Sequence, residues 1–377
     1  MSATRAFWIF TGLLAVAACD DFKAPANATH NAQAAATSQP ALAPSPNAVP
    51  VLNPPAPPAQ AAATPASSRP QAQAIETAAN NAASSRKAAA SATQPFLVRV
   101  EVLLDRAHFS PGVIDGKPGS NFQRAVSAYR AAHGLPAGAA DGALLQSLKG
   151  ADWAPVTQDY VITADDEKGP FLGTVPSGME ALSKLQRVGF ATPLQALAEK
   201  FHMSEALLKS LNPNADFSKV GTSLVVIQTG ATPIQEIAKV EVDKAGNQVR
   251  AMDGAGKILA VFPATVGSTE RPAPSGEWAV KSVTNDPTYT YDPSRLTFGD
   301  KSHGKLTIAP GPNNPVGEVW IALTAETYGI HGTPDPTLVG KTASHGCVRL
   351  TNWDAKALGK ALTPGTPVVF VGETSKA

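Results

Sequence analysis

The sequence has little cysteine, few aromatic residues and almost no net charge, and these shortages exclude whole classes of protein. Two cysteines in 377 residues, Cys19 and Cys347, exclude a disulfide framework and any metal site built from several thiolates. With 31 Lys and Arg against 30 Asp and Glu, the formal net charge of +1 argues against a nucleic-acid binder that relies on bulk positive charge. The N-terminal apolar run, Ala6 to Ala18, falls short of the ~20 residues of a membrane-spanning helix.

That N-terminal run is nevertheless typical of a secretory signal peptide, because a single positive charge, Arg5, precedes it. Its ending, Val16-Ala17-Ala18-Cys19, resembles a bacterial lipobox, in which a peptidase cuts before a cysteine that becomes lipid-modified. The resemblance implies a lipoprotein-type signal peptide over residues 1–18, lipid attachment at Cys19 and a lipid-anchored protein in the periplasm. Asp20 then favours the inner membrane, as in enterobacterial lipoproteins. The alternative is an ordinary signal peptide with an incidental cysteine.

The segment after Cys19 is dominated by two residue types. Between Asp21 and Gln94, 26 Ala and 11 Pro make up half of the 74 residues, and Phe22 is the only aromatic residue. Such a segment buries too little apolar surface to offset its chain entropy. We therefore predict that residues 19–94 are the lipid-anchor cysteine and a disordered tether with a reach on the order of 50 Å. An inert spacer is the alternative.

Residues 95–150 have a helical pattern. Phe122, Ala125, Val126 and Tyr129 recur at the spacing of one helix face, which Gly134 ends. The stretch FSPGVIDGKPGSNFQRAVSAYRAAHGLP resembles the three-helix peptidoglycan-binding domain found beside bacterial wall enzymes. A helical spacer that does not bind is the alternative.

Residues 155–230 predict a small α+β module. Thr192 followed by Pro193 is an N-cap pattern, Ser204 caps a second helix, and Ser223 to Ile227 is typical of a strand. The stretch LAEKFHMSEALLKSLNP is similar to the LysM module, which binds the glycan chains of peptidoglycan or chitin. The long interval between first strand and first helix departs from LysM, so a purely structural LysM-like fold is the alternative.

Residues 234–372 predict a mostly-β domain. Val240 and Val242 alternate with polar residues, and similar alternation returns after the turn at Asp253-Gly254. The clearest helical segment is Asp354 to Leu362.

Histidine, glycine and cysteine cluster within this domain. A thiol attacks as its thiolate, and a nearby imidazole accepts its proton and returns it to a leaving amine. Cys347 follows His345 by two positions and His331 by 16, and this spacing does not decide which histidine is the base. Gly332 and Gly346 permit tight turns and close substrate approach, and backbone N–H groups near Gly346 and Cys347 provide a candidate oxyanion hole.

The two-part pattern IHGT…SHGCVRL resembles the L,D-transpeptidase catalytic domain of the YkuD family, over about 135 residues that also include TVGSTERPAPSGEW, PTYTYDP, IAPGPNNPVG and TNWDAKAL. The resemblance implies a mostly-β YkuD-like catalytic domain. With the upstream segments described above, the protein is expected to be multidomain, this domain being preceded by the disordered tether, a small three-helix domain and a small α+β LysM-like domain. It further implies these roles: Cys347 as nucleophile, His331 as general base and acid, Gly332 as a support of the imidazole, Ser344, His345 and Gly346 on the oxyanion side, and Arg349 as a receiver of a substrate carboxylate or a pin for its loop.

The resemblance also implies a reaction. Cys347 attacks the bond between the L-centre of meso-diaminopimelate and the terminal D-alanine of a tetrapeptide stem, and an amine of a second stem accepts the acyl group to give a 3→3 crosslink. The implied partners are peptidoglycan stems and glycan, the membrane through a lipid anchor, and carbapenem-type inhibitors; no nucleic acid, metal or cofactor is implied. Alternatives are an L,D-carboxypeptidase or endopeptidase using the same residues, and a non-catalytic peptidoglycan-binding lipoprotein.

These residues also allow interpretations without catalysis. A buried cysteine is often an inert small hydrophobe, and a zinc site is conceivable from His303, His331, His345 and Cys347. For the remaining histidines, His108, His133 and His202, we expect surface or packing roles. Three aromatic residues either line the substrate groove or belong to the core: Tyr289, Tyr291 and Trp320.

Overall fold

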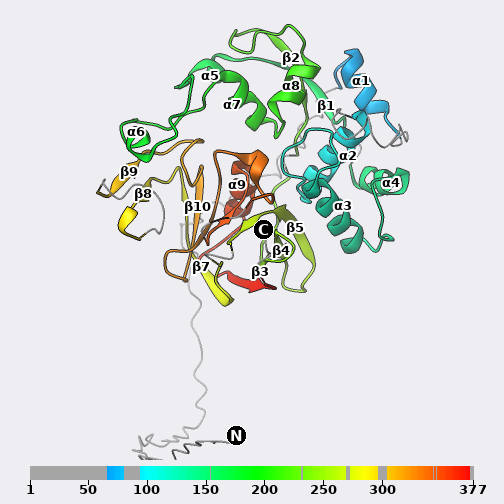
Figure 1. Ribbon diagram of the computed structural model, residues 1–377. Coiled ribbons are helices and arrows are strands. Elements are labelled where there is room, and N and C mark those ends of the chain that lie inside the picture. The colour runs from blue at the N-terminus through cyan, green and yellow to red at the C-terminus, as the bar shows by residue number, and fades with distance from the viewer. Residues whose placement is uncertain are drawn as a thin grey trace, which may run out of the picture. The chain divides into compact units, whose positions relative to one another are not determined.

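The computed structural model describes residues 66–79, 94–152, 154–230, 232–268, 272–295, 304–342, 344 and 346–373 (Figure 1). The predicted signal peptide, Cys19 and most of the predicted tether lie outside these residues. None of the helices in this part of the chain is long and apolar enough to cross a membrane.

A nine-stranded sheet forms the C-terminal part of the chain and confirms the mostly-β class expected there (Figure 1). Its strand order is β5-β4-β3-β13-β7-β10-β11-β12-β6. Only Ala264 separates β5 from β6, yet they stand at opposite ends of this order, so the sheet curls round like a barrel. The strands are β3 (Lys239–Asp243), β4 (Gln248–Met252), β5 (Ile258–Pro263), β6 (Thr265–Val266), β7 (Gly276–Asn285), β10 (Val319–Leu323), β11 (Gly329–His331), β12 (Val348–Arg349) and β13 (Pro367–Val371).

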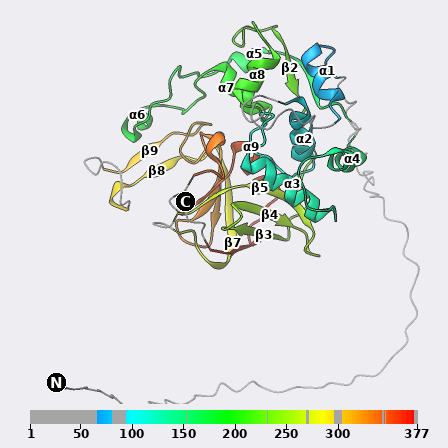
Figure 2. The ribbon, with the colours of Figure 1, turned by 45° about the vertical axis from the view of Figure 1, so that its right-hand side comes forward.

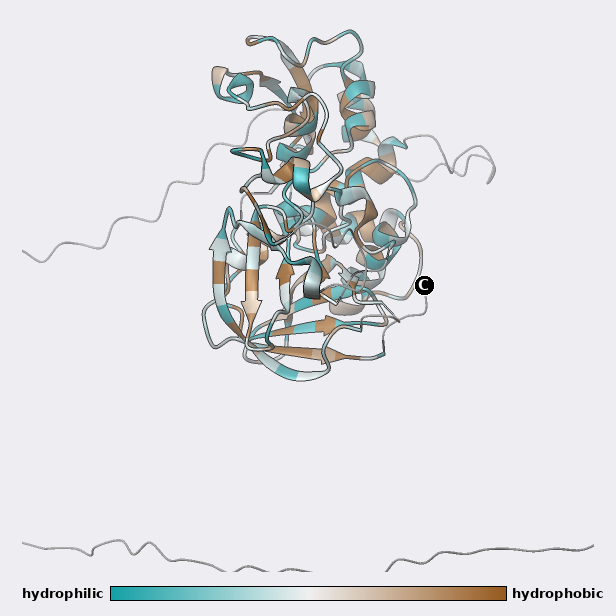
Figure 3. Ribbon diagram, turned by 60° about the vertical axis from the view of Figure 1, so that its left-hand side comes forward, coloured by the Kyte–Doolittle hydropathy of each residue, from teal (hydrophilic) through white to brown (hydrophobic). Residues whose placement is uncertain are grey.

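Alternation along the strands decides which face of the sheet forms the core. Val240 and Val242 of β3 are fully buried, whereas the residues between and beside them are only partly covered. Because neighbouring side chains of a strand point to opposite faces, this pattern collects the valines on one side. Figure 3 shows the apolar residues along these strands.

One helix, α9 (Asn352–Lys360), covers this core. It begins two residues before the predicted Asp354, because the side chain of Thr351 caps it by accepting the Asp354 N–H at 3.1 Å. Ala355 and Leu358 are fully buried. The helix contacts β10 and β11, so its first turn lies close to the strand that ends at His331.

A smaller antiparallel pair stands beside the main sheet. Tyr289 pairs with Ile308, and the fully buried Ile308 packs with Leu182 and Val188 from an upstream segment. The elements here are α6 (Met179–Ser183), β8 (Tyr289–Tyr291), η1 (Pro293–Arg295) and β9 (Leu306–Ile308). The short helix η2 (Pro336–Leu338) lies in the segment between β11 and β12.

The upstream residues form the helices and the strand that the sequence predicts. The stripe from Phe122 to Tyr129 is buried in α3, and Thr192 and Ser204 cap their helices by accepting N–H groups of Gln195 and Leu207. The elements are α2 (Pro95–Arg106), α3 (Ser120–Ala132), α4 (Gly142–Ala151), β1 (Thr157–Val161), α5 (Ala164–Glu167), α7 (Pro193–Lys200), α8 (Glu205–Leu211) and β2 (Ser223–Ile227).

These upstream elements share one hydrophobic core. Leu97 and Leu104 of α2 belong to the same buried cluster as Leu208 of α8 and Val225 of β2. The identification of residues 95–150 as peptidoglycan-binding-like and of residues 155–230 as LysM-like remains a prediction.

Residues 66–79 differ from the expectation. We predicted disorder through Gln94, and for residues 70–77 this is wrong, because they form α1 (Pro70–Thr77), which contacts α2 and β1 (Figure 2). Ile75 is 2% exposed, and the Glu76 carboxylate accepts both the N–H and the O–H of Thr157 at 2.7 Å. One apolar side chain and one charged hydrogen-bonding group suffice to dock a short helix on an existing surface, and an averaged composition conceals both.

Candidate active site

Two neighbouring strands bring the predicted nucleophile and base into one region. β11 and β12 are parallel, with Ile330 beside Val348 and His331 beside Arg349. Ile330 and Val348 are buried in the core of the sheet. Because side chains alternate along a strand, His331 and Arg349 project from the opposite face. Cys347 directly precedes β12 and lies two positions before Arg349 in the chain.

The geometry of His331 fixes its tautomer. The ring is 4% exposed, and Nδ1 lies 2.6 Å from the carbonyl oxygen of Gly332. A carbonyl oxygen only accepts, so Nδ1 carries the proton and Nε2 is left as the acceptor. The ring also stacks on Trp320, its cross-strand partner, with centroids 5.4 Å apart.

The His331 imidazole is neutral at physiological pH. The pKa of His331 is lowered to about 4, chiefly by burial and also by the positive charge of Arg349, while the hydrogen bond to Gly332 opposes both. A neutral imidazole with a free Nε2 is the form that accepts a proton.

Cys347 is a half-buried thiol. Burial raises the pKa of Cys347, while the backbone hydrogen bond with Gly329 and the charge of Arg349 lower it. Sγ lies 3.9 Å from the carbonyl oxygen of Thr327, a distance that fits a weak S–H···O hydrogen bond. These shifts leave the resting thiol of Cys347 protonated and the imidazole of His331 neutral.

Arg349 supplies positive charge to this site. Burial lowers the pKa of Arg349, whereas Cys347 and Tyr289 raise it. Within the described residues no carboxylate forms an ion pair with this guanidinium. Burial, then Cys347, raises the pKa of Tyr289, which places this aromatic residue at the site; Tyr291, by contrast, is 6% exposed.

The loop before Cys347 is held by backbone contacts. Ser344 is 1% exposed; its Oγ donates to the carbonyl oxygen of Cys347 at 2.6 Å, and its N–H donates to Gly267 at 2.8 Å. Gly346 has φ +106°, and a Cβ there would lie 2.9 Å from the Tyr328 ring. Only glycine fits this position. His345 lies outside the described residues.

Asn352, the first residue of α9, supports the site and was not predicted to do so. It is 1% exposed, and its Oδ1 would lie 2.1 Å from a Cβ at Gly332. Its Nδ2 donates to Glu199 and to the carbonyl oxygen of Pro312. The segment TNWDAKAL resembles a family segment, but nothing in its local pattern assigns a role to the asparagine.

The remaining candidates lie elsewhere or are not organised around a metal. In the part of the chain that the structure describes, no group of three or more His, Cys, Asp or Glu side chains is arranged to hold a metal ion; His303 and His345 lie outside it. His133 stacks on Tyr129 at 3.9 Å, which is a packing role.

Comparisons with known proteins agree on one family. The family model of the L,D-transpeptidase catalytic domain, YkuD, matches residues 238–370. YqjB of Bacillus subtilis, named as an L,D-transpeptidase, is 30% identical over 151 residues, which cover 38% of this chain and 77% of YqjB. YkuD of Bacillus licheniformis, named likewise, is 25% identical over 176 residues, 46% of this chain and 91% of that protein.

Solved structures of the same kind are also similar. L,D-transpeptidase 3 from Mycobacterium tuberculosis, in complex with a faropenem-derived adduct, is 15% identical with a TM-score of 0.31; the match covers 43% of this chain and 78% of that one.

Proposed function

The chain belongs to the YkuD family of L,D-transpeptidase catalytic domains, and from that premise we propose that it is a peptidoglycan L,D-transpeptidase that forms 3→3 crosslinks through a cysteine acyl-enzyme. The observation that carries the proposal is the pairing of β11 with β12, which joins the strand of His331 to the strand that Cys347 precedes.

In the first step the Cys347 thiol gives its proton to Nε2 of His331 as Sγ attacks the carbonyl carbon at the L-centre of diaminopimelate. The carbon–nitrogen bond to D-alanine then breaks, and the imidazolium returns the proton to the leaving amine. A thioester remains on Cys347. The neutral state of both groups supports a proton transfer that accompanies attack instead of a standing ion pair.

In the second step an amine of another stem attacks the thioester. His331 accepts a proton from this amine, the carbon–sulfur bond breaks, and the thiolate recovers its proton from the imidazolium. The Nδ1 contact with Gly332 supports this role, because it aims Nε2 in one direction throughout both steps.

The oxyanion of each tetrahedral intermediate requires fixed donors. We assign this role to the backbone N–H groups of Gly346 and Cys347, which the Ser344 hydrogen bond to the Cys347 carbonyl helps to orient. His345 completes this side by resemblance. Arg349, which has no ion pair in the described residues, is assigned to a carboxylate of the stem, because a guanidinium binds a carboxylate with two parallel hydrogen bonds.

The sequence supports a cellular setting for this reaction. The signal peptide pattern and Cys19 favour a periplasmic protein held by a lipid anchor, and the upstream modules are proposed to bind wall glycan. We expect carbapenems to acylate Cys347, because they offer a strained acyl group to the same thiol.

Muropeptide analysis tests the proposal. Wall material incubated with the protein is expected to yield dimers that lack D-alanine at the donor junction, and Cys347→Ala is expected to yield none. Products with and without an added acceptor stem separate a transferase from a carboxypeptidase. Absence of a carbapenem adduct on the folded protein, measured by intact mass, favours a non-catalytic wall-binding protein instead.

A further inference from the structure

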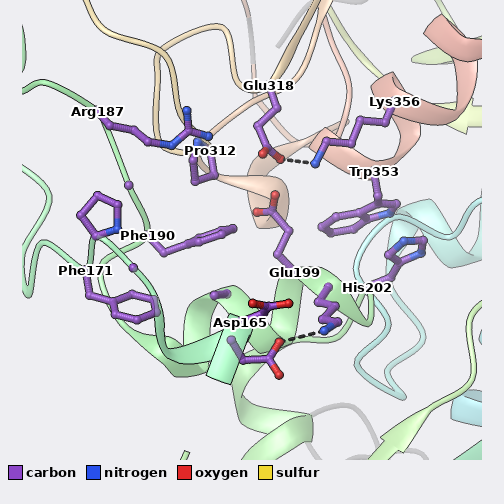
Figure 4. A pocket seen from close by; sticks show the side chains of 16 residues that line it. Asp165, Phe171, Arg187, Phe190, Glu199, His202, Pro312, Glu318, Trp353 and Lys356 are labelled. Atoms are coloured by element: carbon purple, nitrogen blue, oxygen red, sulfur yellow. Dashed lines mark hydrogen bonds and ion pairs between the residues drawn. The ribbon is translucent and has the colours of Figure 1, made fainter. Parts of the chain in front are cut away.

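A cavity of about 470 Å³ lies between α5, α7 and α9, and none of His331, Cys347 or Arg349 lines it (Figure 4). The proposed transpeptidase chemistry therefore makes no use of it. Its volume lies in the range of small-molecule sites, roughly 300–1,000 Å³.

Aromatic side chains form two walls of the cavity. Phe171 and Phe190 stand on one side and Trp353 on the other (Figure 4). The Trp353 ring is fixed by stacking on His202, with centroids 5.0 Å apart and planes at 12°. Such walls suit an aliphatic chain, and the faces of aromatic rings attract cations.

Two carboxyl groups meet between these walls. Glu199 of α7 points toward Glu318, which precedes β10 (Figure 4). Glu318 pairs with Lys356 at 2.5 Å, whereas Glu199 accepts a hydrogen bond from the neutral amide of Asn352 at 2.9 Å. Within the described residues, no basic side chain forms an ion pair with Glu199.

The other charges that line the cavity are already matched. Lys200 pairs with Asp166 at 2.8 Å, and Arg187 pairs with Asp286 at 3.1 Å. Because Lys356 pairs with Glu318, each of the three residues Arg187, Lys200 and Lys356 already has an acidic partner. The cavity therefore has little positive charge left to bind an anion. Within the described residues, Glu199 is the acid of the lining that no basic side chain pairs with; a side-chain hydrogen bond joins it to Glu318 instead.

We propose that this cavity binds a primary ammonium group carried on an aliphatic chain, with Glu199 and Glu318 accepting its N–H donors and Phe190 and Trp353 flanking the chain. The side-chain amine of a diamino acid has this chemistry. One ammonium group has three donors, which suits two adjacent carboxylates, and its charge takes the place of the proton in the hydrogen bond between Glu199 and Glu318.

The protonation state of Glu199 predicts how binding depends on pH. The pKa of Glu199 is raised to about 8, chiefly by burial and also by Glu318, against the opposing effects of the hydrogen bond from Asn352 and the charge of Lys356. His202, whose own pKa is raised in part by Glu199, also faces this group. An entering ammonium group must displace the Glu199 proton, so its affinity rises with pH up to about 8.

Calorimetric titration of the full chain with Nα-acetyl-lysine N-methylamide tests the proposal. We expect one site, tighter binding at pH 8.5 than at pH 7, and proton release at pH 7. Glu199→Gln keeps an oxygen for the Asn352 amide but removes the charge, so it is expected to weaken binding by about tenfold or more. Glu205→Gln, on the neighbouring helix α8 and outside the cavity, is the matched control and leaves binding unchanged.

A second variant separates binding from folding. Phe190→Leu removes one aromatic wall without touching the carboxyl pair, and it is expected to weaken binding several-fold. Equal binding of the Nε-acetylated probe, an unchanged affinity in Glu199→Gln, no binding at all, or binding of neutral N-acetylglucosamine oligomers in its place overturns the proposal. Because the titration does not involve Cys347, each of these results leaves the transpeptidase proposal as it stands.

Discussion

Replacement of Gly332 by alanine is expected to disable acylation, because Gly332 directly follows His331 and packs against the side chain of Asn352. The new Cβ would lie 2.1 Å from the Asn352 Oδ1, 3.2 Å from its Cγ and 3.3 Å from its Cα. Contacts under 3.0 Å cannot persist, so either the Asn352 amide or the backbone at residue 332 must move.

The magnitude follows from what each movement breaks. If Asn352 moves, hydrogen bonds to Glu318, Glu199 and Pro312 are strained at about 1 kcal/mol each, and overpacking adds about 1–3 kcal/mol. If the backbone moves, the carbonyl that holds Nδ1 of His331 shifts with it. A misplacement of about 1 Å costs roughly a hundredfold in rate.

The assay is the rate of thioester formation with a carbapenem, followed by intact mass, together with thermal unfolding. Gly332→Ala is expected to lose about 4–6 kcal/mol of stability if Asn352 moves, and roughly a hundredfold in acylation rate if the backbone moves. Gly254→Ala is the matched control, because a Cβ at Gly254 meets no atom within 4 Å.

A double variant decides whether the clash is the cause. In Asn352→Ala the obstructing oxygen is absent, so adding Gly332→Ala should cost far less than it does alone. If the two costs simply add, or if Gly332→Ala acylates at the wild-type rate with unchanged stability, the support that we ascribe to Asn352 is refuted.

Three further predictions follow from the same structure. Arg349→Lys is expected to raise KM for tetrapeptide stems by about tenfold, because an ammonium lacks the two parallel donors of a guanidinium; an unchanged KM in steady-state kinetics contradicts the carboxylate assignment. The acylation rate is expected to persist at pH 5 to 6, below the ordinary pKa of histidine, and to fall as the pH drops through about 4, where His331 protonates. Because His331 in the unfolded chain already binds its proton near pH 6.5, the stability of the protein is also expected to decline as the pH falls from 6.5 to 4. An acylation rate that falls near pH 6.5 contradicts the buried neutral imidazole. Ile75→Asp is expected to destabilise the protein by about 2–4 kcal/mol in denaturant unfolding, while Ala74→Asp on the exposed face of α1 stays near wild type; equal stability of both variants means that α1 does not dock.

The chain pattern predicted the catalytic sheet well because burial there is one-sided. Val240 and Val242 alternate with partly exposed neighbours, and such a period of two can form only a strand with one covered face. The cluster around Cys347 is visible in the sequence as well, because its pattern of histidine and glycine resembles a family motif; the roles of its residues remain predictions.

What the sequence concealed depends on single contacts between distant segments. Ile75 is one apolar residue in a segment rich in Ala and Pro, and only the surface that receives it makes α1 stable. The role of Asn352 is hidden for the same reason, since its amide touches Gly332 and Glu199, which lie 20 and 153 positions away. A pattern of neighbouring residues in the sequence does not predict contacts between segments that are so far apart.

The hydrogen-bonded pairing of β11 with β12 has a consequence for how this enzyme family can diversify. The segment between them, residues 332–346, joins two strands whose spacing is set by the sheet and not by the length of the connection. Insertions, deletions or exchange between residues 334 and 342 can therefore be accommodated without changing the pairing of β11 with β12, provided that Gly332, Ser344 and Gly346, which hold His331 and the loop before Cys347, are kept.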